Sequence, residues 1–253
     1  MQNIQITRGV ISPTECIKNG WYLLEQNYWL IFGVVTLEWL FFFLMGFIPV
    51  VGSLISILFQ GTLVAGVYFM LIKQIRGQQT SFGEMFQGFR KFLPTLVLGV
   101  LSAIPDILFF IFAYSMNIVT ALQSRATDNN QIIALGIGIV LGSIIFITVF
   151  LILKIIFGVA FFFVFQLIMD HDISIGEAIA LSFRGARQNL GGLALLWLLE
   201  VVIIIGGLLL FCIGFLFVMP IIYAANTFAY RQVFPDSYNN FLTNPSVNYT
   251  NSQ

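Results

Sequence analysis

The chain has 253 residues, of which 59% are hydrophobic and 9% charged, and its formal net charge is zero. Soluble domains hold about 25% charged residues, so a soluble chain of this length could not cover its core with so few charges. The composition therefore excludes a soluble fold and predicts a multi-pass membrane protein. A net charge of zero gives no reason to expect a nucleic-acid partner.

The first 20 residues contain Arg8, Glu15 and Lys18 and no apolar core. We expect no cleavable signal peptide, so that the first spanning helix directs insertion. The two cysteines, Cys16 and Cys212, are far apart and fit neither a CxxC motif nor a disulfide framework. We interpret both as structural thiols.

Apolar windows predict an all-α bundle of about six transmembrane helices. Turn signals separate the helices of the first and last hairpins, at Pro49 with Gly52 and at the glycines before Gly214. Pro105 is expected to kink the third helix. The expected spans are residues 28–47, 53–72, 93–122, 132–169, 190–210 and 215–230.

The fourth apolar segment, residues 132–169, is long enough for one long helix or for two short spans. Two spans require a turn near residues 151–157, where the sequence has no turn signal. We predict one long helix, with Gly158 as a site for a bend.

The basic residues predict the orientation in the membrane. With a cytoplasmic N-terminus, Arg125 falls outside, Lys154 falls within a span, and all other basic residues fall on the cytoplasmic side. This bias predicts the cell inner (cytoplasmic) membrane and places both termini in the cytoplasm. Residues 235–253 are rich in Asn, Ser and Thr and predict a disordered cytoplasmic tail. The cytoplasmic set is Arg8, Lys18, Lys73, Arg76, Arg90, Lys91, Arg184, Arg187 and Arg231.

A pattern of polar residues recurs along the chain. Each copy has a Ser-x-x-Glu box, an amphipathic stretch, and an acid inside an apolar run. The first and last copies are offset by 162 residues, and a looser copy lies between them. We predict a threefold parallel repeat with units 12–72, 81–169 and 174–234 in a single transmembrane domain, 1–234. Ser12, Glu15, Asn27, Glu38 and Gly52 recur as Ser174, Glu177, Asn189, Glu200 and Gly214, and the middle copy has Ser81, Glu84 and Asp106.

Each Ser-x-x-Glu box predicts the start of a helix, because the serine and the glutamate can satisfy each other's free backbone N–H groups. Apolar side chains at helical spacing follow each box, with charged residues on the other faces. We predict three interfacial amphipathic helices at the cytoplasmic face, with their basic residues towards anionic lipid headgroups. The alternative is ordinary connecting helices that pack on the bundle. The predicted caps are Ser12 with Glu15, Ser81 with Glu84, and Ser174 with Glu177.

Four ionisable side chains fall inside the predicted spans, namely Glu38, Asp106, Lys154 and Glu200. Such residues are candidates for an intramembrane polar site. Asp106 and Lys154 are expected at similar depth, and we predict a buried ion pair. Glu38 and Glu200 have no evident basic partner. They form either a proton or cation site or protonated acids that hydrogen-bond to backbone or to each other for helix association.

The sequence contains no recognisable catalytic motif, phosphate loop or Cys/His metal cluster. Asp170-His171-Asp172 lacks metal-ligand spacing and is interpreted as a polar turn before Ser174. We expect no catalytic residue, no metal, no cofactor and no enzyme activity.

Short motifs in the last third resemble a group of bacterial integral membrane proteins of unknown function. That group is similar to the membrane domain attached to some glycerophosphodiester phosphodiesterases. The resemblance covers most of residues 12–234 and implies a bundle of about six helices. It implies no hydrolase activity, since the soluble phosphodiesterase domain is missing, and it transfers no catalytic residues. The motifs are Glu177-Ala178, Ser182, Asn189, Ile213-Gly214, Pro220 and Ala229-Tyr230-Arg231.

Two functions follow from these observations. The first is a non-catalytic membrane protein that organises lipids or partner proteins at the cytoplasmic membrane face. The alternative is a proton- or cation-coupled transporter or channel-like protein that uses the intramembrane acids. A lipid-modifying enzyme has the least support. The expected partners are membrane lipids and membrane or cytoplasmic proteins, and the oligomeric state stays open.

Overall fold

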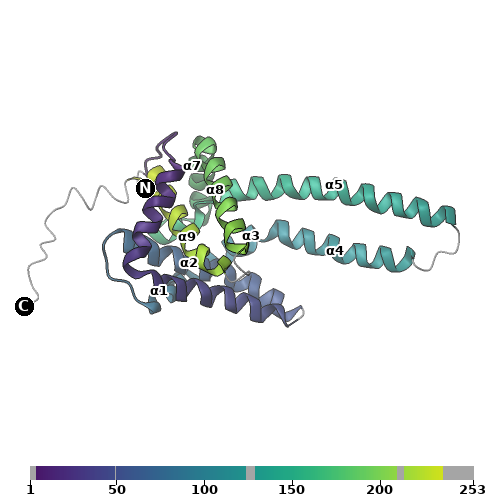
Figure 1. The fold of residues 1–253 in the computed structure, drawn as a ribbon, viewed down its shortest axis with the longest axis horizontal. Coiled ribbons are helices and arrows are strands. Elements are labelled where there is room, and N and C mark those ends of the chain that lie inside the picture. Colours follow the sequence, from purple (N-terminus) through teal and green to yellow (C-terminus); the bar gives the residue numbers. More distant parts are fainter. Residues whose placement is uncertain (1–3, 49, 124–128, 210–213, 236–253) are drawn as a thin grey trace, which may run out of the picture. The chain divides into compact units, whose positions relative to one another are not determined.

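The computed structural model describes residues 4–48, 50–123, 129–209 and 214–235. Within these ranges every regular element is a helix and there is no strand, which confirms the predicted all-α class (Figure 1). The chain divides into two compact units. Unit 1 comprises Met1–Gly99 and Ala160–Gln253, and unit 2 comprises Val100–Val159.

Five of the described helical segments are long and apolar enough to cross a membrane. They are Asn27–Gly46, Val51–Ile75, Ile104–Ala121, Leu135–Asp170 and Leu190–Leu209. The sixth predicted span corresponds to α9 (Gly214–Val233), which is not among them. Asn226 and Arg231 are part of this helix and lower its mean hydropathy. Much of α9 is buried against other helices of unit 1, so it does not need an apolar surface.

The first hairpin of unit 1 consists of α1 (Pro13–Gly46) and α2 (Val51–Ile75). α1 has a break at Asn27, where the backbone leaves helical geometry with φ −143° and ψ 36°. At the turn, a side chain on Gly52 would lie 1.8 Å from the carbonyl oxygen of Met45. Only glycine allows this close approach, which accounts for the predicted turn signal.

The segment after Ser81 is η1 (Phe82–Lys91), a 3₁₀ helix rather than the expected α-helix, and it leads into α3 (Phe92–Ser102). In a 3₁₀ helix side chains three residues apart align. The exposed rings of Phe86, Phe89 and Phe92 follow this spacing, and neighbouring rings lie 6.3 and 6.0 Å apart. On another side, Met85 is buried against α2.

Unit 2 is a helical hairpin of α4 (Ile104–Gln123) and most of α5 (Asn129–Phe161). Ring contacts join the two helices, with Phe112 and Phe146 stacked at 3.6 Å between centroids. The helix ends at Ser102 and restarts at Ile104, beside Pro105, as the predicted kink requires.

The fourth apolar segment confirms the prediction of a long helix, because α5 is continuous as far as Phe161. The expected bend at Gly158 is wrong. The helix breaks instead at Phe162–Phe163, before the short helix α6 (Val164–Asp170). The backbone N–H of Phe163 donates to Ser182 Oγ at 3.0 Å, so a tertiary hydrogen bond replaces a helical one.

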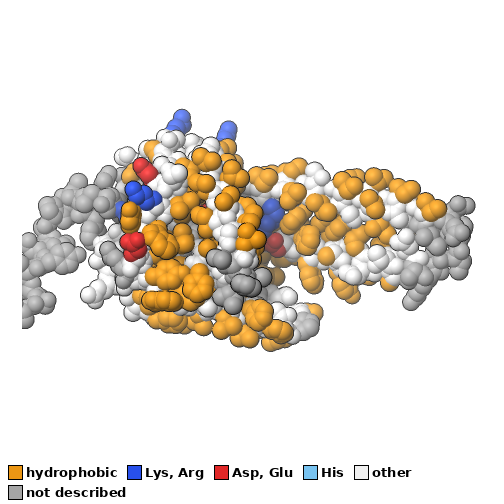
Figure 2. Space-filling model, viewed as in Figure 1, with side chains coloured by type: hydrophobic (Ala, Val, Ile, Leu, Met, Phe, Trp, Pro, Cys, Tyr) orange, Lys and Arg blue, Asp and Glu red, His pale blue; other side chains and the backbone are white. Residues whose placement is uncertain are grey.

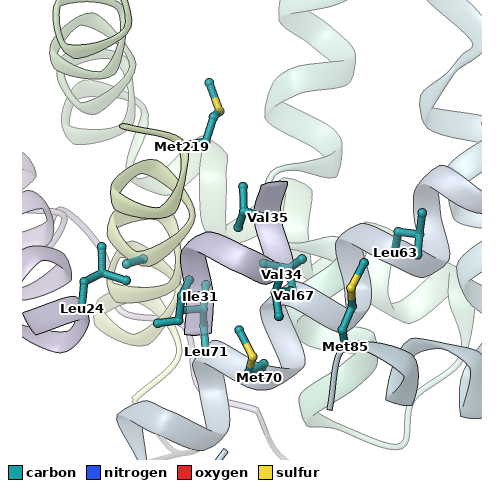
Figure 3. Close-up of a cluster of buried hydrophobic side chains, with 11 residues drawn as sticks. Leu24, Ile31, Val34, Val35, Leu63, Val67, Met70, Leu71, Met85 and Met219 are labelled. Atoms are coloured by element: carbon teal, nitrogen blue, oxygen red, sulfur yellow. The ribbon is translucent and has the colours of Figure 1, made fainter. Parts of the chain in front are cut away.

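The rest of unit 1 is formed by α7 (Ile175–Gln188), α8 (Leu190–Leu209) and α9, which packs against α1, α2 and α8. Aliphatic and methionine side chains from α1, α2, η1 and α9 form the apolar core (Figure 3). Hydrophobic side chains also cover much of the outer surface, as Figure 2 shows, which suits helices that face lipid. The core residues are Leu24, Ile31, Val34, Val35, Leu63, Val67, Met70, Leu71, Met85, Met219 and Ala224.

The three predicted caps differ. At α7 the capping box is confirmed, since Ser174 Oγ accepts from Glu177 N at 3.3 Å and Glu177 Oε2 accepts from Ser174 N at 3.2 Å. Neither Ser12 nor Ser81 makes a side-chain cap, so the prediction is wrong there.

Other partners explain the two failures. The Ser12 N–H donates to Gln232 Oε1 at 2.9 Å, so it does not need Glu15. Glu84 accepts from Lys73 Nζ at 2.8 Å and is not available to Ser81.

Candidate intramembrane polar site

Glu38 lies on the inward face of α1. The buried core residues Val34 and Val35 precede it by one helical turn, so the carboxylate points into unit 1 with them. The side chain is 2% exposed. The Tyr223 hydroxyl on α9 donates to its two oxygens, which lie 3.0 and 3.1 Å away.

Glu200 occupies the corresponding place on α8. It follows Leu193 and Leu196 on the buried face of the helix and is 7% exposed. Unlike Glu38, it accepts no hydrogen bond from a tyrosine, and its Oε1 atom has no hydrogen-bond partner. Among the described side chains there is no hydrogen bond between Glu200 and Glu38, so the alternative in which the two acids bond to each other is not seen.

Neutral polar side chains of unit 1 connect to these acids through Tyr68 and Tyr223. The Tyr68 hydroxyl on α2 faces the amides of Gln166 on α6 and Asn226 on α9, and both carboxylates act on it electrostatically. The rings of Tyr68 and Tyr223 meet edge to face at 5.3 Å. We call Glu38, Tyr68, Gln166, Glu200, Tyr223 and Asn226 the polar cluster.

Several atoms of the polar cluster are buried without a hydrogen bond. Gln166 is fully buried, and neither its Oε1 nor its Nε2 atom has a partner. The same holds for Asn226 Oδ1. No Lys or Arg in the described ranges forms an ion pair with either acid. The cluster therefore combines two carboxylates with buried amide atoms that make no hydrogen bond of normal geometry.

Only the two acids of this cluster were predicted from the sequence. Tyr68, Gln166, Tyr223 and Asn226 were missed. Their signal was an amide or hydroxyl inside an apolar run, which is costly in lipid unless it is enclosed by protein.

The other two intramembrane candidates lie in unit 2. Lys154 Nζ on α5 contacts Asp106 Oδ1 and Oδ2 on α4 at 3.0 and 3.1 Å, which confirms the predicted pairing. The predicted burial is wrong, because the Lys154 and Asp106 side chains are 45% and 57% exposed. In a hairpin of only two helices, each of these side chains has a protein neighbour on one side. The pair therefore cannot be enclosed by protein.

A second polar group lies where α2, η1, α6 and α9 end. Asp170 accepts from Arg76 Nη2 and from the Tyr230 hydroxyl, the latter at 2.9 Å. Lys91 Nζ donates to the backbone carbonyls of Ile168 and His171 at 2.8 and 2.9 Å. These contacts account for Asp170-His171-Asp172 as a polar turn that joins helix ends.

Cys16, on the first part of α1, is buried and lies 3.4 Å from Gln232 Oε1. Burial, with a smaller contribution from Glu15, raises the pKa of its thiol to about 12. The thiol stays protonated at neutral pH and is a poor nucleophile, as a structural cysteine should be. Cys212 lies outside the described residues.

The fold and the site together define an all-helical protein with five described helices able to cross a membrane and a buried polar cluster in unit 1. Comparison with protein-family models, curated proteins and solved structures finds no match. The resemblance to the membrane domain of glycerophosphodiester phosphodiesterases therefore stays a prediction.

Proposed function

We propose that this chain is a multi-pass protein of the cytoplasmic membrane that binds a proton or small cation at the polar cluster and moves it across the bilayer. The observation that carries the proposal is the burial of Glu38 and Glu200 without a cationic partner, with Glu200 Oε1 left unpaired. A charged side chain at the centre of the bilayer costs about 2.5–3.5 kcal/mol on insertion scales. Leaving a buried polar atom without a partner costs about 1–3 kcal/mol more. Neutralisation by a bound proton or cation offsets both costs.

The proposal includes a sixth span at α9 and a threefold parallel repeat. Equivalent backbone geometry supports the relation between the first and last copies. Asn27 has φ −143° and ψ 36°, and Asn189, 162 residues later, has φ −124° and ψ 21°. Each asparagine lies between an amphipathic segment and an apolar helix that carries a buried acid.

We also propose that both termini are cytoplasmic. Contacts among the predicted cytoplasmic loops support their lying on one side of the membrane, because Arg231 Nη1 donates to the Ile75 carbonyl at 3.4 Å and Arg76 pairs with Asp170. The basic residues of these loops favour the cytoplasmic side. Two short spans within residues 132–169 would place Arg231 on the side opposite Ile75, which disagrees with the first contact.

The test is ion flux in proteoliposomes. Purified full-length protein is reconstituted and exposed in turn to proton, sodium and potassium gradients, with a dye for the transported ion inside. We expect flux in the natural protein and loss of flux in Glu38→Gln/Glu200→Gln. Glu25→Gln is the matched control, because Glu25 is an exposed acid on the same helix as Glu38. No flux under any gradient, or full flux in the double variant, would reject the proposal.

A second candidate function, the organisation of lipids at the cytoplasmic face without catalysis, has its own support. Phe82, Phe86 and Phe89 on η1 are exposed beside the exposed Arg90. Arg184 and Arg187 on α7 are also exposed and form no ion pair with the described residues. Exposed aromatic rings and exposed guanidinium groups suit an anionic membrane interface.

This second function is tested by lipid selectivity. Copurified anionic lipid should fall in Arg184→Gln/Arg187→Gln and stay unchanged in Glu38→Gln/Glu200→Gln. Equal lipid composition in all three proteins would contradict it.

A further inference from the structure

The ion pair of unit 2 lies open on the surface of its hairpin. Lys154 and Asp106 contact each other, but their side chains are 45% and 57% exposed. We infer that a second copy of this chain covers this face, so that two unit 2 hairpins pair in the membrane along α5. The inference goes beyond ion movement by the polar cluster and does not depend on it.

Unit 2 lacks the protein surroundings that the helices of unit 1 have. In the most apolar stretch of Ile104–Ala121 6% of the residues are buried, and in that of Leu135–Asp170 none is, against 56% for Val51–Ile75 in unit 1. Charged groups inside spanning helices are costly in lipid and face protein or a water-filled cavity. The exposed neighbours of Lys154 on α5 are apolar, so they offer the pair no polar surface. The pair therefore requires a further protein surface.

A row of exposed aliphatic side chains on α5 leads to Lys154. Its members follow one another at alternating steps of four and three residues, which is the a and d spacing of a coiled coil, and Lys154 takes the next position. Phe146 and Phe150, which contact Phe109 on α4, are not part of the row, so it is free for another helix. We call this row the α5 seam. It consists of Ile133, Ile137, Val140, Ile144, Ile147 and Leu151.

The first turns of the α5 seam are hollowed. Ile133, Gly136, Ile137, Val140 and Leu141 line an open hollow of about 380 Å³. The first four of these residues have the spacing i, i+3, i+4 and i+7. Four residues at this spacing form the hole that receives one side chain of a facing helix in coiled-coil packing. The shape of α5 therefore suits a second helix that runs along the seam.

Charge complementarity identifies that helix as α5 of a second copy. A surface that faces the ion pair has to present a base and an acid at the same depth, and unit 2 presents both. A twofold axis along the membrane normal keeps the two copies at equal depth. Lys154 of each copy then lies between its own Asp106 and that of the second copy. The four charges cancel, and polar contacts between helices hold membrane bundles together.

The experiment is disulfide crosslinking of the full-length protein in lipid vesicles. Cys16→Ser and Cys212→Ser first remove the natural thiols. Val140→Cys then places one thiol in the α5 seam. Val149→Cys is the matched control, because Val149 is also exposed and lies about two and a half turns further along, on the opposite side of α5. With a mild oxidant we expect Val140→Cys to form a covalent dimer, and Val149→Cys to form at least tenfold less.

A second variant tests the role of the charges. Asp106→Leu/Lys154→Met, added to Val140→Cys, removes both charges without leaving one alone, and the ring contacts within the hairpin remain. We expect the covalent dimer to fall at least tenfold at a low ratio of protein to lipid. An undiminished dimer would overturn the inference, as would equal crosslinking at Val140→Cys and Val149→Cys, which indicates random collision. A Val140→Cys protein that stays monomeric would assign this face to another occupant and would also overturn it.

Discussion

The acids of unit 1 and the acid of unit 2 come from similar sequence patterns but have different partners. In unit 2, Asp106 lies beside Lys154 and the pair is half exposed. In unit 1, Glu38 is buried with a tyrosine hydroxyl, and Glu200 is buried with no partner for Oε1. A charge in a two-helix hairpin is compensated by an opposite charge. Inside the larger bundle of unit 1, the carboxylates are buried among helices and form no ion pair with the described residues.

The largest effect is expected from breaking the ion pair of unit 2. Lys154→Met leaves Asp106 without its cation near the start of a candidate span, so we expect a loss in the free energy of unfolding of up to about 2.5–3.5 kcal/mol, the cost of a charge at the centre of a span. Adding Asp106→Leu removes the remaining charge and should restore most of the stability. Unfolding in mixed detergent micelles measures both. If the second substitution brings no recovery, the two side chains do not compensate each other.

A smaller loss is expected from Tyr223→Phe, which removes only the hydroxyl that donates to Glu38. A buried acceptor that loses its donor costs about 1–3 kcal/mol. The same unfolding assay should show this loss. Combining Tyr223→Phe with Glu38→Leu should cost less than the sum of the single changes, because the two side chains share one interaction. Additive losses would mean that the hydroxyl and the carboxylate act independently.

Glu200→Leu should change stability in the opposite direction. An apolar side chain removes a buried polar group whose Oε1 atom has no partner, so we expect a gain of about 1 kcal/mol in alkali-free buffer. The matched change Glu38→Leu should bring no such gain, because it also orphans the Tyr223 hydroxyl. A clear loss in Glu200→Leu would show that Glu200 has a structural partner, and it would remove the difference between the two buried acids.

Composition and periodicity predicted much of this fold. The apolar runs predicted the helices, and Pro105 predicted the kink. The similar depth expected for Asp106 and Lys154 predicted their pairing. The polar cluster was only partly predictable, because Tyr68, Gln166 and Asn226 come from different helices and their convergence depends on tertiary packing. The break at Phe162–Phe163 was not predictable for the same reason, since it accompanies a hydrogen bond to Ser182, nineteen residues later.

The smallest effects should come from the helix starts, which also differ among the copies. Ser174→Ala removes a side chain that caps α7 and should cost about 1 kcal/mol. Ser12→Ala and Ser81→Ala remove side chains that make no cap, so each should cost less than Ser174→Ala.

Unfolding curves of the three single variants, each compared with the natural protein, measure this ranking. Equal losses at all three serines would mean that the copies share their caps in the membrane. The first helix of the first and middle copies would then be capped by its serine, as α7 is. The copies would then differ only in the partners of their acids.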